Sequence, residues 1–207
     1  DFLPKSWFTV KTELEELGQK SNFITIDEYL KLCTENGLKD EISQRTLIGF
    51  LHDLGVVLYF QDDPHLEALG ILNPEWVTNG VYKILNDHDL FQNKGVLNLI
   101  TINDILHSPE YPRDKRLFIV DMMKKFELCY EINENTFLVP DLLPKDEPYT
   151  GDWSGAFAFQ YHYNILPTSI ISRFIVRMHA FIYKTVWRSG VVLKSGGNTA
   201  LIKADTE

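Results

Sequence analysis

The sequence predicts an α+β protein with a tandem winged-helix-like N-terminal subdomain and a partial antiparallel sheet-and-helix C-terminal subdomain. Two observations carry this prediction. Three helices followed by a strand pair occur twice in succession, and strands around one helix follow a proline- and glycine-rich connector. The expected parts are a first repeat over 1–73, a second repeat over 74–145, a connector over 146–155 and a truncated C-terminal subdomain over 156–207.

The first repeat begins with three helices. Residues 4–17 place apolar side chains at steps of three and four, which predicts an amphipathic helix. Thr25 and Glu28 have the spacing of a capping box, so a second helix should begin there and end at Gly37. A third helix is expected over 41–55. Two strands then follow, over 56–60 and 69–72, with a turn at Asp62, Asp63 and Pro64 between them.

The same order of elements recurs in the second repeat. Pro74 opens a helix, Thr101 starts a short one in a context like that of Thr25, and residues 113–126 form a third. A hairpin over 128–132 and 137–139 is expected next. Because a capping motif, a helix-to-strand junction and a strand ending in proline appear twice in one order, we predict two tandem units of one kind.

The C-terminal subdomain has a different pattern. Aromatic side chains alternate with small or polar ones over 157–163, which predicts a strand with one aromatic face. Pro167 begins an apolar helix that extends to about Ile182, and 186–193 and 199–203 predict a hairpin. Two or three strands over one helix bury little surface, so we expect further strands of a longer chain, or a partner, to cover them.

Composition and charge disfavour several classes of protein. The 207 residues carry 20 basic and 29 acidic side chains, and the resulting net charge of −9 repels phosphate backbones. No apolar run approaches the roughly 18–20 residues that a membrane span requires. The chain starts at Asp1 without a signal sequence, which we interpret as a piece cut from a longer protein. Cys33 and Cys129 are too distant for a disulfide framework, so a cytoplasmic protein is expected.

The sequence has no residue pattern typical of a catalytic, cofactor or metal centre. We therefore expect no catalytic, cofactor-binding or metal-binding residues in this chain. A phosphate-binding loop, G-x-x-x-x-G-K-[ST], has no match, and the six histidines are scattered. His52 lies near a predicted helix end and is assigned a structural role. Asp62 and Asp63 are assigned to a turn, and Cys33 and Cys129 to the core.

The alternative interpretation is a winged-helix nucleic-acid-binding protein. The third helix of a winged helix can enter the major groove, and residues 113–125 are mildly basic. The counterpart helix over 41–55 is nearly balanced in charge. Residues 155–161 resemble part of the aromatic strand of RNA-recognition domains. They lack its leading Lys or Arg, so packing of their aromatic face in the core is favoured. We expect no nucleic-acid partner, and a gel shift at low salt would distinguish the two interpretations.

Four stretches resemble conserved blocks of a known family. The sequences FLHDLGVVLYF and LGILNPEWV, over 50–60 and 69–77, are similar to the central signature of COR domains, and 137–140 and 187–193 resemble later blocks. COR, for C-terminal of Roc, follows the Roc GTPase in Roco proteins, a family that includes leucine-rich-repeat kinases. The resemblance covers nearly the whole chain, and a prokaryotic Roco protein is expected.

The resemblance implies a regulatory function without an active site in this chain. A COR domain packs against the Roc GTPase of its own chain and couples the nucleotide state of Roc to dimerisation. GTP or GDP and Mg²⁺ are expected on the adjacent Roc domain, not here. By position in the motif, the side nearest Roc would be formed by Phe60, Gln61, Leu69, Gly70 and Ile71, although the family often has an aromatic residue where this chain has Gly70.

The resemblance also implies a homodimer formed through the C-terminal subdomain. The unfinished sheet would leave an open edge and an aromatic face, and either could associate. The residues assigned to this surface are Phe157, Phe159, Tyr161 and Trp187. The competing interpretation is that other parts of the full-length chain cover this edge and this face.

Overall fold

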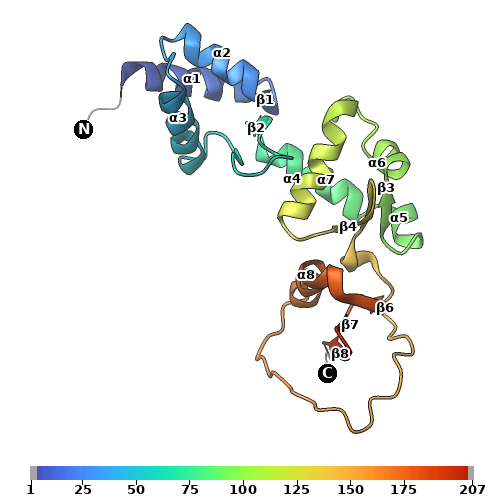
Figure 1. The fold of residues 1–207 in the computed structure, drawn as a ribbon. Coiled ribbons are helices and arrows are strands. Elements are labelled where there is room, and N and C mark those ends of the chain that lie inside the picture. The colour runs from blue at the N-terminus through green and yellow to red at the C-terminus, as the bar shows by residue number, and fades with distance from the viewer. Residues whose placement is uncertain (1–3, 205–207) are drawn as a thin grey trace. The chain divides into compact units, whose positions relative to one another are not determined.

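The computed structural model describes residues 4–204. Within that range the chain is α+β, with eight α-helices and three small antiparallel sheets. It divides into two compact parts, an N-terminal unit, Asp1–Gly80, and a C-terminal unit, Val81–Glu207. Figure 1 shows the order of the elements along the chain. In the described part of the chain, every helix is too short or too polar to cross a bilayer.

From residue 4 onward, the N-terminal unit contains three complete helices and a small sheet, and it ends inside a fourth helix. Its elements are α1 (Lys5–Gly18), β1 (Phe23–Thr25), α2 (Ile26–Glu35), α3 (Glu41–Asp53) and β2 (Leu69–Ile71). The capping box is confirmed: Thr25 Oγ1 accepts from the Glu28 N–H, and the Glu28 carboxylate accepts from the Thr25 N–H at 2.8 Å. Gly37, with φ +82°, follows the second helix, as its position predicted.

The expected strand over 56–60 is reduced to a single bridge. Only Leu58 pairs with Ile71, through N–H···O bonds of 2.8 and 2.9 Å. The next backbone N–H, that of Tyr59, donates to Nδ1 of His52 at 3.1 Å. This side-chain acceptor gives His52 a structural role.

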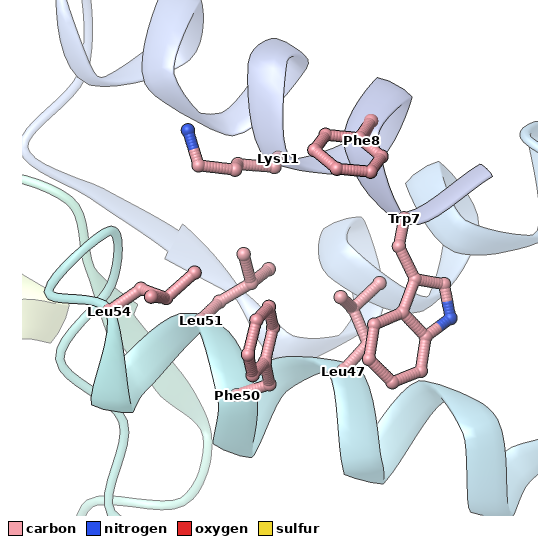
Figure 2. A pocket seen from close by; sticks show the side chains of 7 residues that line it. All are labelled: Trp7, Phe8, Lys11, Leu47, Phe50, Leu51 and Leu54. Carbon is pink, nitrogen blue, oxygen red and sulfur yellow. The ribbon is translucent and has the colours of Figure 1, made fainter. Parts of the chain in front are cut away.

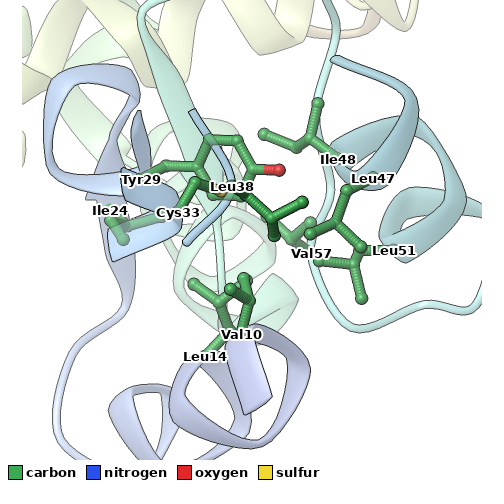
Figure 3. Close-up of a cluster of buried hydrophobic side chains, with 10 residues drawn as sticks. All are labelled: Val10, Leu14, Ile24, Tyr29, Cys33, Leu38, Leu47, Ile48, Leu51 and Val57. Atoms are coloured by element: carbon green, nitrogen blue, oxygen red, sulfur yellow. The ribbon is translucent and has the colours of Figure 1, made fainter. Parts of the chain in front are cut away.

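The core of the N-terminal unit joins all three helices to the sheet. Figure 3 shows the ten buried side chains that form it: Val10, Leu14, Ile24, Tyr29, Cys33, Leu38, Leu47, Ile48, Leu51 and Val57. The assignment of Cys33 to the core is therefore confirmed. Inside this core the Tyr29 hydroxyl donates to the backbone oxygen of Gln44 at 2.7 Å, so its polar end is satisfied.

The C-terminal unit first repeats this order of elements. After α4 (Pro74–Leu85), which contains the boundary between the units, come α5 (His88–Gln92), β3 (Val96–Asn98), α6 (Leu99–Ile105), α7 (Arg116–Lys125), β4 (Tyr130–Asn133) and β5 (Thr136–Leu138). The short helix α6 begins earlier than expected. Oδ1 of Asn98 accepts from the N–H groups of Ile100 and Thr101, both at 3.0 Å, so Asn98 and not Thr101 is its N-cap.

The two sets of strands share one order. In the C-terminal unit the sheet runs β3-β5-β4. In the N-terminal unit β2 pairs with β1 on one side. On its other side, Ile71 of β2 forms a bridge with Leu58, so Leu58 has the position that β4 has in the other sheet. In both sets, the last strand in the chain therefore pairs with the first strand and with the middle segment.

The rest of the C-terminal unit, as far as residue 204, contains one α-helix and three strands. These are α8 (Ser169–Met178), β6 (Ile182–Trp187), β7 (Gly190–Ser195) and β8 (Asn198–Lys203), in the order β6-β7-β8. The single strand expected over 186–193 is two strands, with a turn at Arg188 and Ser189. A Cβ on Gly190 would overlap the ring of Trp187, so glycine lets the chain reverse closely there.

The predicted aromatic strand over 157–163 was wrong for this chain. Figure 1 shows a long connection without helix or strand over 144–168. Alternation supplies a face but no hydrogen-bonding partner, and no described strand pairs with this segment.

Helix α8 packs onto the preceding part of the same unit. Ile175 and Val176 share a buried cluster with Tyr130, Leu138 and Leu143. The Glu127 carboxylate accepts from Nε of Arg173 at 3.0 Å and from Nε of Arg177 at 2.6 Å. Both arginines lie one helical turn apart on α8, so a single carboxylate holds both.

Candidate protein-docking site

A hollow between α1 and α3 is the candidate functional site of the N-terminal unit. Side chains of the two helices face each other across it (Figure 2). Its volume is about 80 Å³, and it is lined by Trp7, Phe8, Lys11, Leu47, Phe50, Leu51 and Leu54. On α3 the lining residues recur at steps of three and four, which places them on one face of the helix.

The hollow has a buried floor and an open rim. Leu47 and Leu51 are fully buried and belong to the core of the unit. Phe8 is 55% exposed and Leu54 is 51% exposed, so the rim is apolar and reaches solvent. The rings of Trp7 and Phe50 close one side, with centroids 5.8 Å apart. The floor is therefore part of a rigid core, and the rim offers apolar surface to a partner.

No reactive group lines the hollow. Its one charged lining side chain is Lys11, whose Nζ pairs with Glu15 Oε1 at 2.6 Å. The other six lining residues are aromatic or aliphatic. Such a wall binds by excluding water from apolar surface, so the site fits docking of an apolar group.

Outside the hollow, metal ligands and the two cysteines were the remaining candidates for a reactive site. Among residues 4–204, no group of three or more His, Cys, Asp or Glu could hold a metal ion. Burial raises the pKa of the Cys129 thiol to about 12 and also raises the pKa of Cys33. Both thiols are protonated at neutral pH and are poor nucleophiles.

The five residues expected to face Roc fall into two groups. Leu69, Gly70 and Ile71 form β2, and the side chains of Leu69 and Ile71 are 3% and 0% exposed. Phe60 is half-buried, with its ring 6.0 Å from that of His52, and Gln61 is exposed. That these five residues face Roc stays a prediction. Among them, only Phe60 and Gln61 have side chains that a partner could reach.

The four residues expected at a dimer surface also divide. Phe157, Phe159 and Tyr161 are 96%, 86% and 83% exposed, so their aromatic rings are available to a partner. Trp187 is 2% exposed, at the end of β6. The dimer itself stays a prediction, and its accessible aromatic surface is the 157–161 segment.

Two of the basic residues on α7 have polar partners within the chain. Arg116 donates to Oδ1 of Asn103 at 2.9 Å and to the Tyr111 backbone oxygen at 3.1 Å. Lys124 pairs with Asp121 and Glu131. To contact phosphate groups of a nucleic acid, these two side chains would have to leave their partners in the chain. This arrangement therefore does not favour the nucleic-acid alternative.

The sequence pattern did not separate the rim of the hollow from its floor. The spacing of Leu47, Leu51 and Leu54 predicts that they share one face of the third helix, but spacing alone does not show which of them a neighbouring element covers. Phe8 was not singled out at all. The signal that could have found it is its position beside Trp7, which widens the apolar stripe of the first helix toward solvent.

Comparison with protein families finds two matches that together span most of the chain. Residues 4–143 match the family described as "C-terminal of Roc, COR-A domain". Residues 154–207 match "C-terminal of Roc, COR-B domain". The ion pairs of Glu127 with Arg173 and Arg177 therefore link side chains from the two matched regions.

Known proteins similar to this chain are much longer. The chain is 31% identical over 196 residues to a Roc-COR-CHAT protease of Runella zeae, covering 92% of this chain and 20% of that protein. It is 26% identical over 221 residues to the Dictyostelium discoideum protein named "Probable serine/threonine-protein kinase pats1", covering 97% of this chain and 7% of that protein. The chain thus spans a fifth or less of these relatives.

One solved structure resembles the chain in fold and sequence. It is that of Methanosarcina barkeri Roco2 RocCORdC bound to GDP. The similarity has a TM-score of 0.64 and 46% sequence identity, and it covers 68% of this chain and 44% of that chain.

Proposed function

The chain belongs to the COR family, with the COR-A and COR-B domains of a Roco protein, and on that premise we propose that it is a non-catalytic regulatory module that docks on the Roc GTPase domain of its own parent protein. The family match over 4–143 and 154–207 is the observation that carries this proposal. In Roco proteins the COR domain lies next to Roc, so Roc is the nearest folded partner.

The site supports docking in place of chemistry. Its walls are apolar, and its rim is open at Phe8 and Leu54. Regulation then follows from differential affinity: if the domain binds GTP-loaded and GDP-loaded Roc unequally, each nucleotide shifts the equilibrium between bound and released states. GTP or GDP and Mg²⁺ bind on the Roc domain in this proposal, and this chain needs no cofactor.

The proposal includes dimerisation through the C-terminal subdomain. Its support is the accessible aromatic segment containing Phe157, Phe159 and Tyr161, because exposed apolar side chains that lie together mark interaction sites. Nucleotide state would then be coupled to dimerisation and to the kinase or protease regions that the relatives carry. We expect this in the cytoplasm, where the free thiols of Cys33 and Cys129 stay reduced.

The proposal also assigns a repeat structure to the N-terminal part of the chain. We interpret the two sets of elements before residue 145 as winged-helix-like repeats over 1–73 and 74–145, followed by a connector over 146–155 and the start of a sheet-and-helix subdomain over 156–207. The shared strand order, with Leu58 in the place of β4, supports this.

Titration of the Roc domain of the parent protein into this chain tests the function. Calorimetry should show binding, with a Kd that differs between GDP and a non-hydrolysable GTP analogue. Absence of heat in both nucleotide states, at concentrations where both proteins are folded, would contradict the proposal.

A further inference from the structure

The hollow between α1 and α3 has the size and chemistry to hold the end of one side chain. We propose that it receives a single large apolar side chain, of the Leu or Met type, from the surface of the Roc domain. This inference rests on the proposed function and names the part of the COR-A region that makes the contact. It moves the principal contact from Leu69 and Ile71, which are buried, to the rim formed by Phe8 and Leu54.

The volume of the hollow restricts the occupant. A water molecule takes about 30 Å³ of liquid, and an apolar cavity of about 150 Å³ holds benzene. At about 80 Å³ the hollow lies between these, and it is far smaller than the roughly 300–1,000 Å³ of ordinary small-molecule pockets. It therefore fits the end of one side chain better than a metabolite.

The wall has the features of an interface anchor point. Leu47 and Leu51 form a floor that is fixed by the core, and the rings of Trp7 and Phe50 form a side wall. Binding energy at protein interfaces concentrates where a large side chain enters such a preformed and desolvated pocket. The half-exposed rim can exclude water around it.

Charge indicates which partner surface would surround the inserted side chain. Between residues 4 and 80 the chain carries thirteen acidic and six basic side chains. Asp53, which precedes Leu54 in the chain, is exposed and has no ion pair among the described residues, and the positive charge of Lys11 in the wall is offset by Glu15. A partner with basic side chains flanking its apolar one is complementary to this surface, and its association should be faster at low salt.

The test compares rim variants with a matched control on the same helix. Phe8→Ala and Leu54→Ala remove the rim, whereas Ile42→Ala removes a side chain of α3 that is 76% exposed and lies outside the hollow. The Roc domain, loaded with GDP or a non-hydrolysable GTP analogue, is titrated into each full 207-residue chain. We expect at least about a tenfold rise in Kd for each rim variant and no change for Ile42→Ala.

Two further measurements separate lost docking from lost folding. Circular dichroism should show the same helix content in all variants, and Phe8→Leu, which refills the rim, should recover most of the affinity. In NMR spectra the indole N–H signal of Trp7 should shift on Roc addition, while that of Trp153 should not. If Phe8→Leu binds as weakly as Phe8→Ala while both stay folded, apolar filling of the rim is not the cause and the inference is wrong.

The remaining outcomes distinguish this inference from the function on which it rests. If the wild-type chain binds Roc and the rim variants bind equally well, the hollow is not the contact and the docking function stands. If the wild-type chain binds Roc in neither state, both fail. If the rim variants change only self-association of the chain, the occupant is a second copy and the inference is overturned.

Discussion

Gly70 is enclosed by side chains of its own unit. A Cβ there would lie 2.9 Å from Cγ2 of Val57 and 3.3 Å from Cγ2 of Ile24. Gly70→Ala should therefore lower the free energy of unfolding by about 1–3 kcal/mol, because overpacking displaces a well-packed neighbour. Urea unfolding at neutral pH measures this.

Gly49 supplies the control for this change. It lies inside α3, and a Cβ there would meet no atom within 4 Å. Gly49→Ala should leave the fold intact and raise stability by roughly 0.5–1 kcal/mol, since alanine favours the helix. Equal effects of the two substitutions would show that the enclosure of Gly70 is unimportant.

Glu127 makes the stability of the C-terminal unit depend on pH. The adjacent Arg177 and Arg173 hold the pKa of its carboxyl below the ordinary value. Because the pKa is lower in the folded state, the stabilisation is present above the unfolded pKa of about 4.3 and is lost as the pH falls through the folded pKa. Glu127→Gln should be less stable than wild type at neutral pH, and the difference should shrink below about pH 4.

Denaturant unfolding curves between neutral and acidic pH measure this difference. Glu134 offers a matched carboxylate, since it is exposed in the turn between β4 and β5. Glu134→Gln should show no comparable pH-dependent loss. A gap between wild type and Glu127→Gln that stays constant with pH would rule out the ion pair as its origin.

At the scale of elements, α2 depends on its N-terminal capping box. Thr25→Ala removes the acceptor for the Glu28 N–H, so the variant should lose about 1 kcal/mol of stability. Thr34→Ala on the same helix removes only a bond to the Leu30 backbone oxygen and should change stability little. Thermal unfolding of both variants distinguishes a cap effect from a general intolerance to alanine, which would destabilise both equally.

The aromatic segment over 157–163 should be the first site of proteolysis. Its side chains at 157, 159 and 161 are more than four-fifths exposed, and no described strand pairs with it. Chymotrypsin should cleave there well before it cleaves at the buried Trp187, which limited digestion with mass spectrometry would show. If the segment forms the dimer surface, cleavage should slow as the protein concentration rises.

For the whole molecule, the acidic net charge predicts no binding to nucleic acid. Because the net charge is −9 and Lys124 and Arg116 have partners within the chain, a labelled DNA duplex should show no change in fluorescence anisotropy on adding this chain at low salt. Low salt gives electrostatic binding its greatest strength. Binding that weakens steeply with added salt would revive the winged-helix nucleic-acid interpretation.

Local rules predicted much of the fold of this chain. The capping box of α2, the Gly37 helix end and the amphipathic stripe of α1 depend on neighbours within a few residues, so the sequence by itself determined them. The family signature over 50–60 and 69–77 likewise carried the assignment to COR. Length, charge and cysteine usage also depend on the sequence alone.

Only the tertiary structure decided the features that need a partner distant in sequence. A strand exists when another strand accepts its hydrogen bonds, so 56–60 kept one bridge and 157–163 became no strand despite its alternation. Burial likewise depends on what faces a side chain: Leu69 and Ile71 lie inside the unit, whereas Phe8 and Leu54 form the open rim of the hollow. Periodicity shows which face of an element is apolar, but only packing shows whether anything covers it.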